Sequence, residues 1–394
     1  MNAFFASVEQ YDNPKLRNKA LLITNGQFGT TVITCSYEAR RYGIKTGMSV
    51  IEAKQRCPGS ITLASRARRY QEIATAIWLR LMEHVTPDLE VASIDEAYLD
   101  FSYCRHLYAN YKDMIGAIQS CMSELYPLPY SIGISSTKKI AKYAAGFRKP
   151  NGITVIPPQH VKKWLAPIKL SELCGVGVQT AKTLAKDGLI YCYQVQALPI
   201  SVLTRKLGVV GKWIWLCCQG IEFEPIVVKQ PEPVSLSHSK VLPPSTYDME
   251  QVWSVFQVLC AKIGQRLRMM QCRATCIFIR VKTAQRHYFE RKIQIKDGIQ
   301  DEYRLFAMLR SQFRWPYGLA IRHVHIGAWE LIPANQQSFI QLKHNHNLLA
   351  VQDEIEKKYG KGAIRPMRMI KTNLGAFQSI TPRWRIESDK NTQT

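Results

Sequence analysis

The sequence is poor in acidic residues for its length. Its 394 residues hold 30 Asp and Glu against 53 Lys and Arg, and the net charge is +23. The excess is concentrated between Lys262 and Lys296, where ten basic residues occur with one acid, Glu290. Basic side chains displace the cations that surround phosphates and so favour a polyanion. This clustering favours a protein that binds nucleic acid over one that is basic throughout without such a partner.

Long apolar runs and metal-binding cysteine patterns are also missing. No stretch is apolar enough to span a membrane and no secretory leader is visible, so we expect a cytoplasmic protein. The eleven Cys show no paired CxxC spacing, which indicates reduced thiols rather than a disulfide or zinc framework. His323 and His325 alternate along the chain without further ligands, as do His344 and His346, and this argues against zinc.

The most informative segment has the sequence SIDEAYLD and runs from Ser93 to Asp100. Its adjacent carboxylates, Asp95 and Glu96, lie between two alternating runs, 90–94 and 97–101, that predict strands. Carboxylates at a turn between strands are held rigidly and can bind divalent cations. For a bare Asp-Glu pair, a solvated hairpin turn is the simpler interpretation. The whole segment, however, closely resembles the SIDEAYLD box of the Y-family DNA polymerases, the UmuC/DinB-like (ImpB/MucB/SamB) translesion enzymes.

Three further residues resemble nucleotide-binding positions of this family. Tyr37 and Arg40 lie three residues apart on a predicted helix, so one face can offer a phenol and a guanidinium to a triphosphate. They match the YEAR box of the Y-family fingers. Lys149, which precedes Pro150, matches a family lysine that meets the triphosphate. Without the resemblance, all three are ordinary solvated surface residues.

The first residues resemble the segment that directly follows the first β-strand of the family. Phe5 matches the aromatic steric gate, which excludes a 2′-hydroxyl from the incoming nucleotide; by itself it is an ordinary core Phe. The resemblance also implies a nucleotide contact at Phe4 and a metal contact from the backbone carbonyl of Met1. A family aspartate stands directly before the position of Met1. We expect the reading frame to continue upstream into that strand and aspartate, because a truncated product would also lose a core strand.

Strands interleaved with helices around the carboxylate hairpin predict an α+β fold, the right-hand polymerase. The predicted palm, 1–8 and 66–155, has an antiparallel sheet backed by helices, and the small fingers occupy 9–65. The helical thumb is expected at 156–228. Its glycines precede predicted helices and resemble helix-hairpin-helix phosphate clamps, with tight turns as the alternative. The DNA-binding residues predicted in the thumb are Gly175, Gly177, Lys182, Gly208 and Gly211.

A Pro-spaced linker, 229–235, precedes the predicted little finger, 236–333. The order strand, helix, strand, strand, helix, strand predicts a ferredoxin-like β-α-β-β-α-β unit. Arg280 and Lys282 alternate with apolar residues, so we expect them on a face that contacts DNA phosphates. In the tail, 334–394, a Gln-apolar segment at 336–342 resembles sliding-clamp-binding boxes, with a disordered connector as the alternative.

The resemblance implies template-directed transfer of a nucleotide from dNTP to a primer 3′-hydroxyl. It also implies two Mg²⁺ ions held by Asp95, Glu96 and the Met1 carbonyl, and a monomer that bypasses DNA damage in the SOS response. Proofreading is not expected, because no exonuclease-like carboxylate cluster is evident. Two alternatives stay open: a catalytically inactive DNA-binding protein and a palm-like nucleotidyl cyclase. The thumb-like clamps and the basic C-terminal region disfavour the cyclase.

Overall fold

The computed structural model describes residues 1–26, 29–221, 224–228, 232–315, 318–334, 346–359 and 363–364. The chain divides into two compact units at Gln230 and Pro231. This division falls inside the predicted linker, of which residues 229–231 lie outside the described part. No helix among the described residues is both long and apolar enough to cross a lipid bilayer.

The first unit contains a three-stranded sheet near its N-terminal end, with strand order β2-β1-β3. β1 pairs antiparallel with β2 and parallel with β3, a strand that was not predicted. The strands are β1 (Leu21–Thr24), β2 (Val32–Cys35) and β3 (Ile61–Ala64). The two helices beside them, α2 (Tyr37–Arg40) and α3 (Val50–Arg56), begin after side-chain caps from Ser36 and Ser49.

Two small sheets follow, and their strand directions differ. The carboxylate hairpin pairs antiparallel as predicted, whereas β6 and β7 pair parallel because α6 crosses over between them. The strands are β4 (Leu89–Ser93), β5 (Glu96–Leu99), β6 (Ile132–Ile134) and β7 (Ile153–Val155). The helices are α1 (Phe4–Asp12), α4 (Ala67–His84), α5 (Tyr111–Leu125) and α6 (Lys138–Phe147). A buried core joins α1, α4 and α5 to the hairpin, so the hairpin stands on a packed base.

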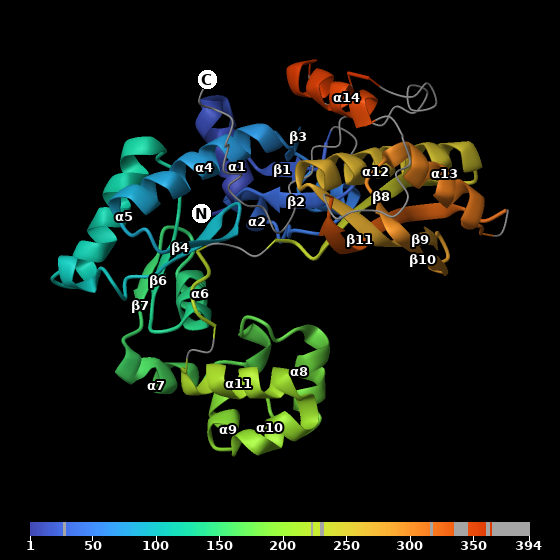
Figure 1. Ribbon diagram of the computed structural model, residues 1–394. Helices are drawn as coiled ribbons and strands as arrows, with labels where there is room; N and C mark the ends of the chain where they lie inside the picture. Colours follow the sequence, from blue (N-terminus) through green and yellow to red (C-terminus); the bar gives the residue numbers. More distant parts are fainter. Residues whose placement is uncertain are drawn as a thin grey trace. The chain divides into compact units, whose positions relative to one another are not determined.

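Short helices build the rest of the first unit (Figure 1). They are α7 (Val161–Leu165), α8 (Val178–Ala185), α9 (Cys192–Gln196), α10 (Ile200–Leu207) and α11 (Val209–Gln219). Short 3-10 helices are η1 (Pro14–Leu16), η2 (Arg105–Leu107), η3 (Pro158–His160) and η4 (Leu170–Glu172). Helices α7 to α11 and η4 share one core, in which the buried thiols Cys192, Cys217 and Cys218 lie.

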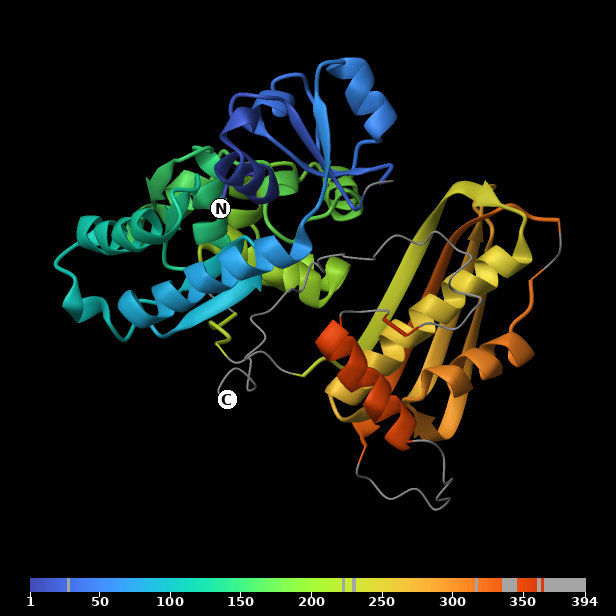
Figure 2. The same ribbon diagram turned by 90° about the horizontal axis from the view of Figure 1, so that it is seen from above.

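The second unit is a four-stranded antiparallel sheet with two helices on one face, as the element order predicts. The strands are β8 (Ser235–Thr246), β9 (Cys272–Thr283), β10 (Tyr288–Ile299) and β11 (Ile321–Pro333). The strand order is β10-β9-β11-β8, so each pair of strands joined by a helix is separated by another strand. Figure 2 shows α12 (Met249–Met269) and α13 (Glu302–Gln312) over the same face.

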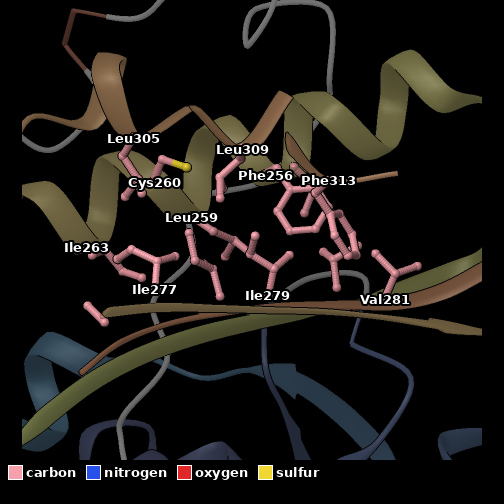
Figure 3. Close-up of a cluster of buried hydrophobic side chains, with 14 of the residues drawn as sticks. Phe256, Leu259, Cys260, Ile263, Ile277, Ile279, Val281, Leu305, Leu309 and Phe313 are labelled. Atoms are coloured by element: carbon pink, nitrogen blue, oxygen red, sulfur yellow. The ribbon is translucent and has the colours of Figure 1, made fainter. Parts of the chain in front are cut away.

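The core of the second unit explains which sheet face is left open. Ile277, Ile279 and Val281 are fully buried against the two helices, and Figure 3 shows Phe256 and Leu259 of α12 directed towards them. Side chains of a strand alternate between faces, so the residues between these three lie on the opposite face.

A third helix, α14 (His346–Tyr359), is held against the second unit by a charged cluster. Arg268 of α12 lies at its centre and is only 12% exposed. Its guanidinium donates to Asp353 of α14 at 2.7 Å and also to Glu302 at the start of α13. Leu349 of α14 is buried as well. One arginine therefore ties three helices together.

We expect Arg268→Ala to destabilise the second unit by about 3–5 kcal/mol, because Glu302 would remain as a buried, unpaired carboxylate. Arg310→Ala is the matched control, since its ion pair with Glu250 is exposed and should be worth about 0–1 kcal/mol. Urea unfolding of the full chain measures both. Equal effects of the two substitutions would contradict the central role of Arg268.

Candidate active site

The two predicted carboxylates lie at the tip of the β4–β5 hairpin. Asp95 occupies the turn, and its carboxylate accepts a hydrogen bond from the Ser93 hydroxyl at 2.7 Å. The backbone carbonyl of Asp95 accepts from the amino group of Met1 at 2.5 Å. The structure therefore brings Met1 and Asp95 together, although 94 positions separate them.

Glu96 is paired with a lysine that was not predicted. Lys142 of α6 donates to its carboxylate at 2.7 Å. Burial raises the pKa of Glu96, but the hydrogen bond and charge of Lys142, with the charge of Lys149, outweigh burial and lower it overall. Glu96 is therefore ionised at neutral pH and offers an anionic oxygen. Because Lys149 contributes to this shift, the structure also brings this predicted residue near the carboxylates.

Lys138 makes the corresponding contact one helical turn earlier. It donates to Glu90 of β4 at 2.7 Å. Lys138 and Lys142 thus hold α6 against the hairpin through a carboxylate on each of its strands. The four-residue spacing of the two lysines was the available sequence signal, but their partners are about 46–48 positions away and no local pattern identifies them.

Phe5 lies against an aromatic ring of α4. Its ring stacks on Tyr70 with 4.4 Å between centroids and 9° between planes. The Tyr70 hydroxyl donates to Glu9 at 2.6 Å, and Glu9 also accepts from Arg66 at 2.9 Å. Burial and this carboxylate raise the pKa of Tyr70 far above its usual range, so the hydroxyl keeps its proton. The orientation of Phe5 is therefore supported by a tyrosine that the sequence analysis did not identify.

Phe4 has a different environment from Phe5. Its side chain is 2% exposed and packs in the core shared by α1 and α4. The predicted nucleotide contact therefore cannot come from the Phe4 ring, because the helix places that ring on the buried face. Only the Phe4 backbone remains available for such a contact.

Tyr37 and Arg40 share one side of α2, as predicted. The Arg40 guanidinium lies over the Tyr37 ring at 4.8 Å. The Tyr37 hydroxyl is buried without a hydrogen-bond partner among the described residues, and burial raises its pKa. An unpaired buried hydroxyl costs free energy, and a ligand oxygen that accepts its proton would remove that cost.

Three of the four predicted thumb glycines lie at turns or helix ends. Gly175 has φ +94°, a conformation that other residues rarely adopt. Gly177 caps the start of α8, on which Lys182 is exposed. Gly208, with φ +60°, joins α10 to α11. These positions suit backbone contacts with phosphates.

Gly211 is a correction to the predicted DNA contacts. It is buried inside α11, and a Cβ there would overlap the Leu203 carbonyl of α10. The glycine allows the two helices to approach each other closely, so we assign it to packing. From the sequence alone, a glycine near the start of a predicted helix suits a phosphate contact and close helix packing equally well.

In the second unit, Arg280 and Lys282 lie on the open face of β9, as predicted. Arg280 pairs with Glu290 of β10 at 2.7 Å, and Lys282 lies 5.1 Å from the Tyr288 ring centroid. Among the described residues, no group of three or more His, Cys, Asp or Glu side chains is arranged to hold a metal. Within the described residues, Asp95 and Glu96 therefore form a pair of carboxylates and not a group of three or more metal ligands.

Both units of the chain match known proteins. Residues 1–146 match the impB/mucB/samB family, and residues 233–342 match the C-terminal domain of that family. The chain belongs to the impB/mucB/samB family. These are the Y-family, UmuC/DinB-like proteins, so the resemblance inferred from SIDEAYLD and YEAR is confirmed.

Relatives from this family align along nearly the whole chain. DNA polymerase IV of Moorella thermoacetica is 31% identical, covering 92% of this chain and 93% of the relative. DNA polymerase IV 1 of Bacillus subtilis is 30% identical, covering 93% and 90%. A solved Y-family DNA polymerase chimera, Dbh-Dpo4(243-245)-Dbh, has a TM-score of 0.71 at 24% identity, covering 84% of this chain and 97% of that one. The α+β polymerase fold is confirmed.

Proposed function

We propose that this chain is a translesion DNA polymerase, which transfers nucleotides from dNTPs to a primer 3′-hydroxyl under the direction of a template. The observation that carries the proposal is end-to-end similarity to two DNA polymerase IV relatives, combined with a rigid hairpin that presents Asp95 and Glu96. The inactive DNA-binding alternative and the cyclase are not favoured.

The donor atoms at the hairpin suit Mg²⁺, which prefers carboxylate and carbonyl oxygens. Asp95, Glu96 and the Met1 carbonyl would hold the ions. Bound Mg²⁺ neutralises charge on the phosphates and lowers the pKa of the attacking hydroxyl. Lys142 keeps Glu96 ionised, since its charge lowers the pKa of that carboxyl.

The remaining residues would bind and select the nucleotide. We assign the triphosphate to Tyr37, Arg40 and Lys149, which together offer a free hydroxyl and two cations. Phe5, supported by Tyr70, would lie against the sugar and exclude a 2′-hydroxyl. This selection works through a clash with the wrong substrate rather than a contact with the right one.

DNA would be held mainly through its backbone. We assign phosphate contacts to Gly175, Gly177, Lys182 and Gly208 in the predicted thumb, and to Arg280 and Lys282 in the predicted little finger. The subdomain boundaries 1–8 and 66–155, 9–65, 156–228 and 236–333 remain part of this proposal. The proposed clamp-binding segment, 336–342, lies outside the described residues and stays a prediction, as do the monomeric state and the cytoplasmic location.

Primer extension tests the proposal on templates with and without an abasic site. Two proteins are compared, the chain from Met1 and an extended form to which a strand ending in aspartate is added before Met1. The extended form should copy past the lesion with Mg²⁺ and leave a mismatched primer end uncut. Tight DNA binding without extension by either form would instead support the inactive DNA-binding alternative.

A further inference from the structure

Two aromatic rings, one exposed and one half-buried, stack on the open face of the second unit. Phe278 of β9 and Trp329 of β11 lie 5.5 Å apart between centroids, with 6° between planes. β9 and β11 are the two central strands of the sheet. Trp329 is 39% exposed, so its ring is available to a ligand although it sits in the middle of a sheet.

A glycine provides the space for this stack. Gly327 pairs directly with Phe278 across the two strands. A Cβ at Gly327 would lie 3.2 Å from the Trp329 indole nitrogen, closer than an ordinary contact. The missing side chain therefore lets the indole lie flat beside Phe278. The ring arrangement is specified by the backbone register as well as by the two aromatic residues.

Cations and further rings extend the stack across the sheet. The Arg280 guanidinium lies 5.0 Å from the Phe278 centroid and 5.5 Å from that of Tyr288. Lys282 lies 5.1 Å from the same Tyr288 ring, which is 54% exposed. Aromatic faces and positive charges thus alternate from β11 to β10.

His325 continues the aromatic surface along β11, with its ring 5.8 Å from Phe278. Burial is the main cause of its lowered pKa, and the charges of His323 and Arg280 lower it further. The ring is therefore neutral at pH 7 and stacks as an uncharged aromatic. On β8, the residue opposite His325 is Ser239, which adds no charge.

We propose that this aromatic face, defined by Phe278, Arg280, Tyr288, His325 and Trp329, binds unpaired bases of single-stranded DNA by stacking. Duplex DNA presents its phosphates outward and its bases are already stacked on each other. Cations alone would therefore be enough to bind a duplex, and exposed rings would add nothing. A flat ring on a basic sheet suits an unpaired base, because every base has an aromatic face. RNA-recognition sheets likewise place aromatics on a four-stranded sheet to stack bases.

The inference rests on the proposed DNA contact of Arg280 and Lys282 but not on catalysis. It is therefore tested by binding alone, without dNTP or Mg²⁺. The probes are a fluorescent 20-nucleotide oligothymidine and an abasic strand with the same number of phosphates. The full chain should prefer the base-bearing strand, and Trp329→Ala should reduce that preference about tenfold while leaving abasic affinity unchanged.

Matched variants separate stacking from loss of fold. Trp329→Tyr keeps an aromatic ring and should retain most of the preference. Val241→Ala, an exposed apolar position on β8, should change neither affinity. Melting curves of all variants identify any that unfold.

Two outcomes would overturn the proposal. One is an unchanged preference in folded Trp329→Ala, and the other is an equal loss on both strands, which would mean that the face contacts only the backbone. Asp95→Ala should leave the preference intact, so a failure of polymerase activity is distinguished from a failure of base stacking.

Discussion

Asp95→Ala and Glu96→Ala are each expected to reduce primer extension by several orders of magnitude while primer-template affinity changes little. A missing carboxylate removes a ligand for the ions that neutralise phosphate charge, whereas the grip on DNA comes mainly from phosphate contacts elsewhere. The measurement combines single-turnover extension with anisotropy binding, using the extended form to which a strand ending in aspartate is added.

Variants that keep the side-chain shape but remove the negative charge sharpen this experiment. Asp95→Asn and Glu96→Gln keep the shape of each side chain and should be almost as inactive as the alanine variants. Glu83→Gln removes a carboxylate from α4 that is 72% exposed and should extend primers normally. Retained extension by both Asp95→Ala and Glu96→Ala would reject the hairpin as the catalytic site.

Phe5→Ala is expected to raise ribonucleotide incorporation strongly while deoxynucleotide use falls much less. The reason is steric, because removing the ring opens space beside the sugar C2′ without adding a contact to either substrate. Single-nucleotide insertion with a matched dNTP and rNTP measures the effect in the same extended protein. Unchanged discrimination in a stably folded variant would remove the gate assignment.

A structural explanation for Phe5 predicts a different result. If the ring only fills the core, Phe5→Ala should destabilise the fold by about 3–5 kcal/mol and impair both sugars equally. A melting curve of the same preparation detects this. Phe4→Ala is the matched control, since Phe4 is 2% exposed and should lose stability without changing sugar selection.

The contact between Phe5 and Tyr70 also shows where sequence reasoning ends. Tyr70 lies on the apolar face of α4, so its burial follows from helical periodicity. Its contact with Phe5 does not follow from periodicity, because 65 positions separate the two residues. Their rings stack only because α1 packs against α4. The same holds for Lys142 and Glu96, which meet because α6 lies against the hairpin.

Local patterns determined the parts of this protein whose signals are short-range. The alternating runs around Asp95 and Glu96, the YEAR helix and the strand-helix order of the second unit follow from periodicity and turn chemistry. The charge excess indicated a polyanion partner, and the order of the motifs indicated the family. The strand, turn and helix signals come from residues within one element or in consecutive elements, whereas the charge and the motif order are read along the whole chain.

Tertiary structure decided everything that depends on which distant elements pack together. It added β3, paired β6 with β7 in parallel, and assigned Gly211 to helix packing. It also placed Arg268 at the junction of three helices and left Trp329 exposed beside Gly327. The physical reason is that side-chain periodicity specifies which face of an element is buried, but not which partner buries it; that choice depends on the shape and charge of the whole fold.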